Sequence, residues 1–157
     1  MDVALDLAGQ VLAERLLELA PEPVTLVPIP NSHAHVGVPP TFRTLRLAEA
    51  VAARSEGRNR ACPALLWAVA KEKQHQMGGY RSANQFYPNL RITQALETPV
   101  VLIDDVVTSG SQMLASAYLL RKAGVTVLFG MAVGRATTEQ TDRVLSWSED
   151  VITQLVM

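Results

Sequence analysis

The chain has 157 residues, of which 48% are hydrophobic and 18% charged, and its formal net charge is −1. The length suits one domain with a sizeable core, residues 1–157, and the composition is ordinary for a globular protein. A charge so close to zero would not attract nucleic acid or an anionic membrane, so we expect no direct nucleic-acid binding. The single cysteine, Cys62, excludes an internal disulfide and a zinc site of several cysteines. No apolar run approaches the ~20 residues of a membrane span, and the acidic start is unlike a signal peptide, so a soluble cytoplasmic protein is expected.

The first segment predicts an amphipathic helix over residues 2–20, which Pro21 and Pro23 would end. Its expected apolar face consists of Val3, Leu7, Val11, Leu16, Leu17 and Leu19. We assign this helix a packing role against a sheet and no chemistry.

Val24–Val27 predicts the first core strand. The loop that follows contains Asn31 and Ser32, which either present small polar groups at the carboxyl end of the strand or belong to an ordinary turn. His33 and His35 are two residues apart, as in some metal sites. Exposed loop histidines are favoured, because no cysteine or acidic residue lies nearby in the sequence.

A second helix is predicted from Thr41, as its N-cap, to about Ser55, and a polar turn over residues 55–60 follows it. Arg43 is assigned to the solvated face, with ligand binding as the alternative. Ala64–Ala70 predicts the second core strand, with a buried helical turn as the alternative. Trp67, within it, is expected in the core.

The stretch Lys71–Arg91 is basic and too polar to be a simple connection. Its charges are Lys71, Lys73, Arg81 and Arg91 against Glu72. Long loops in compact domains are typically functional or disordered. We interpret this one as a mobile flap that closes over an anion, with Gly78 and Gly79 as its hinge, and a solvated excursion is the alternative.

Residues 100–112 carry the strongest functional pattern. Val100–Ile103 is apolar without alternation, which indicates a strand buried on both faces. Asp104 and Asp105 are costly in a core, so we expect them at the carboxyl end of the strand, where open α/β sheets bind ligands. Thr108–Gln112 then supply N–H groups, hydroxyls and a glycine at the start of a helix, which suits a phosphate.

The remaining chain continues the alternation of strands and helices. A helix is predicted from Ser111 to Lys122 with Gly124 just after it, then a fourth strand at Val125–Val133. Thr137 or Thr138 would cap a final helix, and Val151–Val156 would form an edge strand. The predicted fold class is therefore α/β, with a parallel sheet flanked by helices.

The stretch from Val100 to Ser111 resembles the phosphoribosyl-diphosphate (PRPP) motif of type I phosphoribosyltransferases. In that motif four apolar residues, two acidic residues and two further apolar residues precede a Thr/Ser-Gly-rich turn. The fold of that superfamily has a flexible loop and a small hood, for which residues 1–20 and 134–157 are the candidates here. The ComF-like competence proteins look nearest within it. The similar residues are Val27-Pro28-Ile29-Pro30, Leu47-Ala48, Gln74 or Gln76, Arg81, Asn84 and Phe86. This sequence departs from that branch by lacking its zinc ribbon, by a shorter spacing around Phe86, and by Gln112 where Thr or Ser usually closes the turn.

The resemblance implies an enzyme that binds PRPP with Mg²⁺, transfers the phosphoribosyl group to an unidentified nitrogenous base and releases pyrophosphate. Asp104 and Asp105 would contact the ribose hydroxyls and hold Mg²⁺ through water and ligand oxygens. The 5-phosphate would be bound by Thr108, Ser109, Gly110, Ser111 and Gln112. The pyrophosphate would be bound by Asn31, Ser32, Lys71, Lys73 and Arg81. The acceptor ring could stack on Tyr80, Phe86, Tyr87 or Trp147, and a homodimer is expected.

Acidic residues after a strand also occur in two other families, and neither fits this sequence. A response-regulator receiver domain carries its acids near the chain start, and a haloacid-dehalogenase-type phosphatase needs Asp-x-Asp, so both are discounted. The serious alternative is a non-catalytic protein of the same fold that senses PRPP or a nucleotide, or serves as an interaction module, with a link to DNA uptake as in ComF proteins. Gln112 keeps this alternative open, because it removes a hydroxyl from the phosphate turn.

Overall fold

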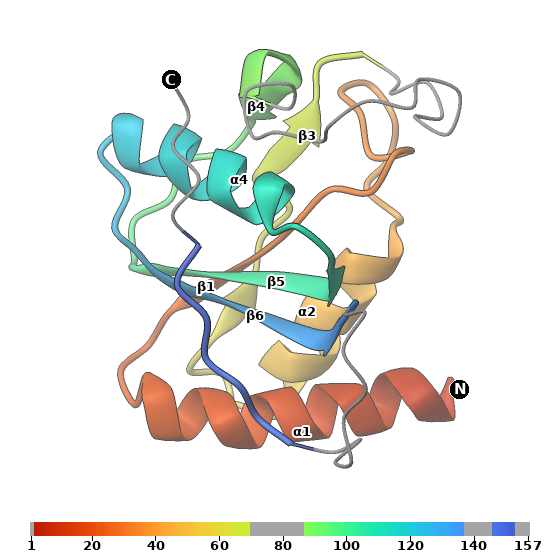
Figure 1. Cartoon of the computed structure of the whole chain (residues 1–157), viewed down its shortest axis with the longest axis vertical. Coiled ribbons are helices and arrows are strands. Elements are labelled where there is room, and N and C mark those ends of the chain that lie inside the picture. The colour runs from red at the N-terminus through yellow and green to blue at the C-terminus, as the bar shows by residue number, and fades with distance from the viewer. Residues whose placement is uncertain (1, 70–86, 137–145, 153–157) are drawn as a thin grey trace.

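The computed structural model describes residues 2–69, 87–136 and 146–152 (Figure 1). Its centre is a four-stranded parallel sheet in the order β2-β1-β5-β6. The strands are β2 (Arg60–Ala61), β1 (Thr25–Pro28), β5 (Val100–Val107) and β6 (Val127–Arg135). All of β1 and the first five residues of β5 are buried, which confirms that these two apolar runs are central strands.

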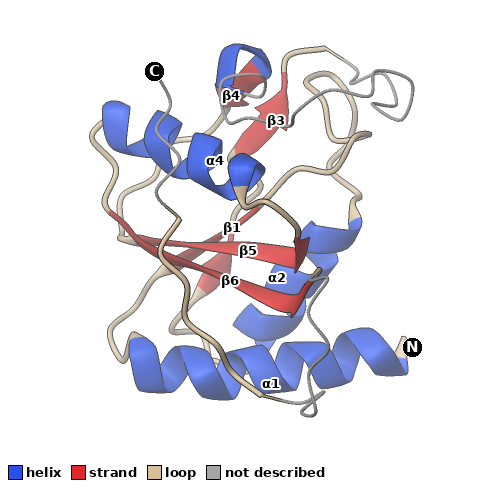
Figure 2. Cartoon of the chain, viewed as in Figure 1, coloured by secondary structure: helices blue, strands red, loops and turns tan. Residues whose placement is uncertain are grey.

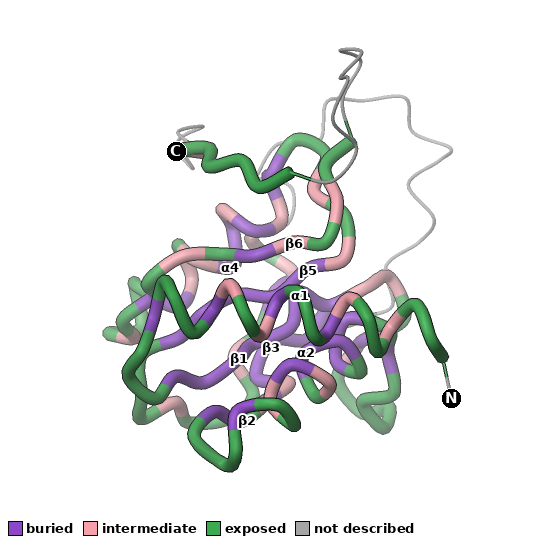
Figure 3. Tube along the Cα trace, turned by 90° about the horizontal axis from the view of Figure 1, so that it is seen from below, coloured by how far each residue is buried: buried purple, intermediate pink, exposed green. Residues whose placement is uncertain are grey.

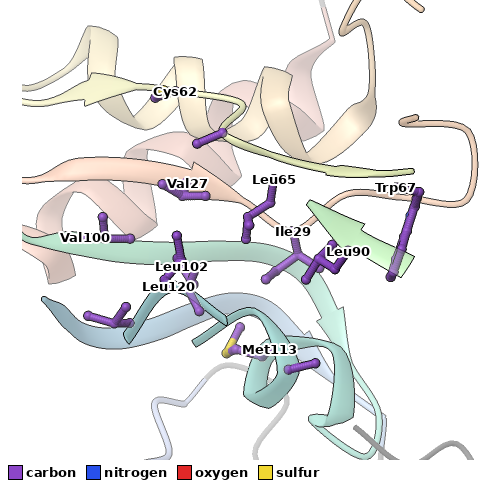
Figure 4. Close-up of a cluster of buried hydrophobic side chains, with 13 residues drawn as sticks. Val27, Ile29, Cys62, Leu65, Trp67, Leu90, Val100, Leu102, Met113 and Leu120 are labelled. Atoms are coloured by element: carbon purple, nitrogen blue, oxygen red, sulfur yellow. The ribbon is translucent and has the colours of Figure 1, made fainter. Parts of the chain in front are cut away.

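Helices cover both faces of this sheet, as Figure 2 shows. On one face lie α1 (Val3–Leu19) and α2 (Arg43–Ala53), which share a core with β5 residues such as Val101 and Ile103. On the other face lies α4 (Ser111–Lys122), whose Met113 and Leu120 pack with Val27, Leu102 and the neighbouring side chains drawn in Figure 4. The predicted α/β class, a parallel sheet flanked by helices, is confirmed.

A small antiparallel ribbon stands apart from the main sheet. It consists of β3 (Leu65–Trp67) and β4 (Leu90–Ile92), and a 3₁₀ turn, Tyr87–Asn89, leads into β4. The prediction of a core strand within Ala64–Ala70 is confirmed for Leu65–Trp67, which is buried, but its expected place in the parallel sheet is wrong. The strand beside β1 is Arg60–Ala61, at the end of the predicted polar turn. An apolar run such as β3 indicates that its residues are buried, but it does not identify the strand with which they pair.

The apolar face predicted for α1 is also largely wrong. Val3, Leu7 and Val11 are 78%, 60% and 43% exposed, whereas Leu12 and Leu16 are buried. Figure 3 shows the buried side of α1 turned toward the body of the molecule. A reason is Gly9, where an added Cβ would come 2.8 Å from the Cβ of Ala50 on α2. The face that carries this small residue permits a close approach of the two helices, whereas Val3, Leu7 and Val11 share the exposed face with polar residues such as Gln10.

Other expectations can be compared with the described residues. The helix Ser111–Lys122 is confirmed, and Gly124 after it has a φ of +86°. Thr41 is not the cap of α2, because the helix begins after Phe42, which makes no side-chain cap hydrogen bond. Residues 1–20 are wrong as a hood, because α1 covers a sheet face. Residues 151–152 are not in a strand, and the predicted cap at Thr137 or Thr138 lies outside the described residues.

Within the described ranges, no helix combines the length and the apolar character that crossing a membrane requires.

Candidate functional site

The predicted acids and the predicted phosphate turn lie at the same edge of the sheet. Asp104 and Asp105 are the fifth and sixth residues of β5, and the turn after Val107 leads directly into α4. Because all four strands are parallel, the loops after β5 and β1 leave from this edge too. This is where open α/β sheets bind their ligands.

Asp104 is a buried carboxyl group, 9% exposed. Its Oδ1 accepts a hydrogen bond of 2.8 Å from the main-chain N–H of Asp105. Burial raises the pKa of Asp104 to about 7; the Asp105 side chain adds to the rise, and the main-chain hydrogen bond opposes it. A carboxyl group with such a pKa exchanges its proton near neutrality, which is typical of functional sites.

Asp105 is more accessible, and its side chain is 39% exposed. Its Oδ1 accepts a hydrogen bond of 2.7 Å from the N–H of Val106. Its Oδ2 lies 3.9 Å from the Nε of Arg43, the first residue of α2. Sequence reasoning had placed Arg43 on the solvated face, and it is indeed 75% exposed, but it also faces the acid pair.

The turn over residues 108–112, here called the phosphate turn, encloses a small cavity. Gly110 has a φ of +79°, a conformation that glycine adopts without strain. The hydroxyl of Ser109 donates to the hydroxyl of Ser111 at 2.9 Å, and the Ser111 N–H donates back to Ser109 Oγ at 3.3 Å. The cavity measures about 150 Å³ and is lined by Asp104, Val106, Val107, Thr108, Ser109, Gly110, Ser111, Gln112 and Met113. The structure thus brings together every residue predicted for the 5-phosphate and one of the two acids.

The close packing of α4 on the sheet sets the position of this turn. Gly130 of β6 lies beneath Met113, and a Cβ at Gly130 would overlap the Met113 side chain. The missing side chain in the strand therefore lets the first turn of the helix approach the sheet. A glycine inside a strand can mark such a close approach, and sequence reasoning overlooked this one.

The loop after β1 holds the predicted Asn31 and Ser32, both half-buried. The Asn31 side chain accepts a hydrogen bond from the His33 N–H at 3.0 Å. Its main-chain oxygen accepts one from Trp67 Nε1 at 2.8 Å. Trp67 is 1% exposed, which confirms its core placement, and it also fastens this loop.

Several predicted site residues lie outside the described residues. These are Lys71, Lys73 and Arg81, the hinge at Gly78 and Gly79, and the ring candidates Tyr80 and Phe86. Of the other ring candidates, Tyr87 packs edge-on against Tyr118 with centroids 5.1 Å apart, and Trp147 lies under Arg15. Both aromatic rings are thus engaged in packing. Arg91, at the end of the predicted flap, is in β4, and its guanidinium donates to Pro88 O and Leu90 O.

The acid pair suits a magnesium ion that arrives with a phosphorylated ligand. Among the described residues, no three His, Cys, Asp or Glu side chains are grouped as a metal site, and this includes His33 and His35. Mg²⁺ prefers oxygen ligands, keeps several waters and commonly uses one or two carboxylates together with substrate phosphates. Asp104 and Asp105 fit that donor set and do not form a site of protein ligands alone.

A larger cavity of about 240 Å³ lies between α1 and the end of α2. Apart from Arg58, its polar side chains are already bonded within the protein. Asn59 Oδ1 accepts from the Val24 N–H, Ser55 Oγ donates to Ala52 O, and Arg54 pairs with Asp6. We therefore place the functional site at the acids and the phosphate turn, although the cavity there is smaller.

Comparison with known proteins gives structural matches only. No family model and no curated protein matches the chain. Adenine phosphoribosyltransferase from Leishmania donovani matches with a TM-score of 0.51 and 16% identity, over 86% of this chain and 54% of that one. A further adenine phosphoribosyltransferase structure matches with a TM-score of 0.50 and 15% identity, over 82% of this chain and 69% of that one. A hypoxanthine phosphoribosyltransferase from Staphylococcus aureus matches with a TM-score of 0.49 and 12% identity, over 86% of this chain and 74% of that one.

These identities carry the fold and no more, and the chain spans about half the length of the Leishmania enzyme. The structural match to these two neighbours extends over more than four fifths of this chain. The chain therefore has the type I phosphoribosyltransferase fold.

Proposed function

We propose that this chain is a phosphoribosyltransferase, that is, an enzyme that binds PRPP and transfers its phosphoribosyl group to a nitrogenous base with release of pyrophosphate. The observation that carries the proposal is the juxtaposition of two carboxylates and a phosphate-sized turn at the end of one central strand. Asp104 lines the same cavity as residues 108–112. A ligand with a phosphate and neighbouring hydroxyls matches both features.

In this proposal different residues of the chain bind different groups of PRPP. The main-chain N–H groups of the phosphate turn, at the start of α4, bind the 5-phosphate. Asp104 and Asp105 bind the ribose hydroxyls. Asn31 and Ser32 meet the pyrophosphate from the loop after β1, and Lys71, Lys73 and Arg81 of the predicted flap would complete that site.

The proposed reaction explains why the site combines two acidic residues with Mg²⁺. The bond between the anomeric carbon and the pyrophosphate oxygen breaks, its electron pair leaves with the pyrophosphate, and a bond to the acceptor nitrogen forms. Positive charge develops on the ribose, where the acid pair stabilises it. Mg²⁺, when bound with the ligand, would neutralise charge on the leaving pyrophosphate.

The acceptor is proposed to be a purine base. Two structural neighbours with TM-scores of 0.51 and 0.50 are adenine phosphoribosyltransferases, which favours a purine as the acceptor. Adenine and hypoxanthine are therefore the first compounds of a panel that also includes other bases and amines.

A second candidate is a protein that binds PRPP or a nucleotide without turnover, including a ComF-like role linked to DNA uptake. One observation favours it, because Gln112, half-buried, stands where a hydroxyl usually closes the turn. Binding without pyrophosphate release would identify this candidate.

The test is calorimetry with PRPP and Mg²⁺, followed by pyrophosphate release with the base panel. Asp104→Asn and Asp105→Asn should each weaken binding or turnover by about hundredfold, the size seen when one preorganised electrostatic group is removed. Glu97→Gln is the matched control, because Glu97 is an exposed acid that precedes the amino end of β5. Wild type that fails to bind, with both variants indistinguishable from it, would overturn enzyme and sensor together.

We further propose that residues 1–157 form one domain, that the protein is a homodimer, and that it acts in the cytoplasm. Sedimentation velocity tests the homodimer, which should appear as a single species of twice the chain mass, and one cooperative unfolding transition would support the single domain.

A further inference from the structure

The described carboxyl-terminal segment, residues 146–152, crosses the molecule as an extended chain that we call the strap. In Figure 1 it rises from α1 past β6 toward the side of α4. Arg15 of α1 holds its beginning, with a guanidinium nitrogen 3.6 Å from Glu149 and its charge 5.6 Å from the centre of the Trp147 ring. Asp150 forms an ion pair with Arg135, the last residue of β6.

The Arg135 anchor lies beside the start of the phosphate turn. Arg135 pairs in register with Val107, the last residue of β5. The N–H of Ala136 donates to the oxygen of Val107 at 2.9 Å. The strap is thus attached at the level where β5 gives way to the turn.

Beyond that anchor, Ile152 packs on the turn itself. A Cβ at Gly110 would come 2.5 Å from Ile152 Cδ1, 3.2 Å from its Cγ1 and 3.3 Å from its Cγ2. Gly110 is accordingly buried, whereas Thr108 and Ser109 are exposed. The side chain therefore covers the main chain at the residue with the left-handed conformation.

Ile152 covers the turn from outside the cavity. The residues that line the cavity are Asp104 and 106–113, and none of the strap residues is among them. The contact of Ile152 with Gly110 therefore leaves the space for a ligand open. It restricts the turn from outside the cavity.

We propose that Ile152 is a positioning residue for the phosphate turn, held in place by the strap. The inference rests on the proposed function in one respect, namely that the turn binds a 5-phosphate. A turn whose N–H groups are already oriented binds an anion more tightly, because less conformational entropy is lost on binding. Each exposed ion pair of the strap contributes little by itself, so its several anchors act together.

The first measurement needs no ligand. Amide hydrogen exchange of residues 108–112 is compared in wild type, Ile152→Ala, Ile152→Leu and Val151→Ala. Val151 is the matched control, because it is the adjacent apolar residue and is 87% exposed. Exchange should speed up in Ile152→Ala alone, with Ile152→Leu close to wild type and the midpoints of thermal unfolding unchanged.

The second measurement is binding of ribose 5-phosphate and of magnesium pyrophosphate to the same variants. Ile152→Ala should bind ribose 5-phosphate about fivefold more weakly, an effect of the size expected when one side chain no longer orders a loop. Its affinity for pyrophosphate should not change, because that group binds elsewhere.

The outcomes separate the two proposals. Unchanged exchange in Ile152→Ala, or equal changes in Val151→Ala, overturns the positioning role. Wild type that does not bind ribose 5-phosphate overturns the phosphate site of the proposed function, and the exchange comparison still decides the role of Ile152.

Discussion

The two loops that leave the carboxyl edge of the sheet are built in different ways. The residues of the phosphate turn are contiguous and bond one another through the Ser109 and Ser111 hydroxyls, and Ile152 adds a contact from outside at the left-handed Gly110. The loop after β1 is held mainly by side chains from elsewhere, since Thr44 donates to Ile29 O and Trp67 donates to Asn31 O. The residues proposed for the 5-phosphate therefore lie in one short stretch, whereas the loop predicted to bind pyrophosphate is held mainly by contacts that are distant in sequence.

The largest effect is expected from Gly110→Ala, which tests whether the turn has one required geometry. Alanine at a φ of +79° is strained, and its Cβ would collide with Ile152. We expect ribose 5-phosphate to bind at least about hundredfold more weakly, since displaced N–H groups no longer converge on the phosphate. The control is Gly124→Ala, at a φ of +86° with nothing within 4 Å of the new Cβ. Calorimetry that shows the same loss in both variants would contradict a special geometry at the turn.

The second prediction is a pH-dependent change in stability caused by Asp104→Asn, in the strand β5 that precedes the turn. A pKa of Asp104 raised to about 7 by burial means that the folded chain holds a proton that the unfolded chain has lost. Its contribution to the free energy of unfolding is present below the unfolded pKa of 3.8 and is lost as the pH rises through about 7. Asp104→Asn should thus be more stable than wild type at about pH 8, by on the order of 2 kcal/mol, and the gap should close toward about pH 4.

Urea unfolding of both proteins across this pH range measures the gap. A difference independent of pH would show that Asp104 keeps an ordinary pKa.

Trp67→Phe tests the other loop. The substitution keeps an apolar ring in the core and removes the hydrogen bond to Asn31 O. The free energy of unfolding should fall by about 1 kcal/mol for the lost hydrogen bond, and further because the smaller ring leaves part of the buried space empty. PRPP affinity should fall severalfold while ribose 5-phosphate affinity stays constant, because in the proposed binding mode only PRPP reaches the loop after β1. Equal losses for the two ligands would mean that the loops are not independent.

The smallest effect is expected where the two loops meet. Arg43, at the start of α2, lies 3.9 Å from Asp105 of β5, and it is 75% exposed. Exposed pairs of this kind contribute about 0–1 kcal/mol, so Arg43→Gln should change the free energy of unfolding by less than about 0.5 kcal/mol. A loss of several kcal/mol in chemical unfolding would show that the pair couples the loops.

The contrast between the loops also explains what the sequence could and could not predict. Val100–Ile103, the acids, the turn and the helix after it are contiguous, so their local pattern contained the arrangement that the structure has. Arg60–Ala61 was missed as a strand because two residues have no periodicity. The partner of β3 and the Arg43–Asp105 pair arise from long-range packing. On α1, apolar residues occur on both faces, and the close contact of Gly9 with Ala50, which the local pattern does not reveal, lies on the buried one.

The position of β6 has a consequence for handling the protein. Among the described strands, this nine-residue strand ends the sheet. The outer edge of such a strand can pair with an extended segment of another chain, which is a route to aggregation. The ion pair between Arg135 and Asp150 fastens the strap at one end of this strand. Substitutions that loosen the strap should therefore increase light scattering with protein concentration before they lower the unfolding temperature, and variants are best compared in dilute solution.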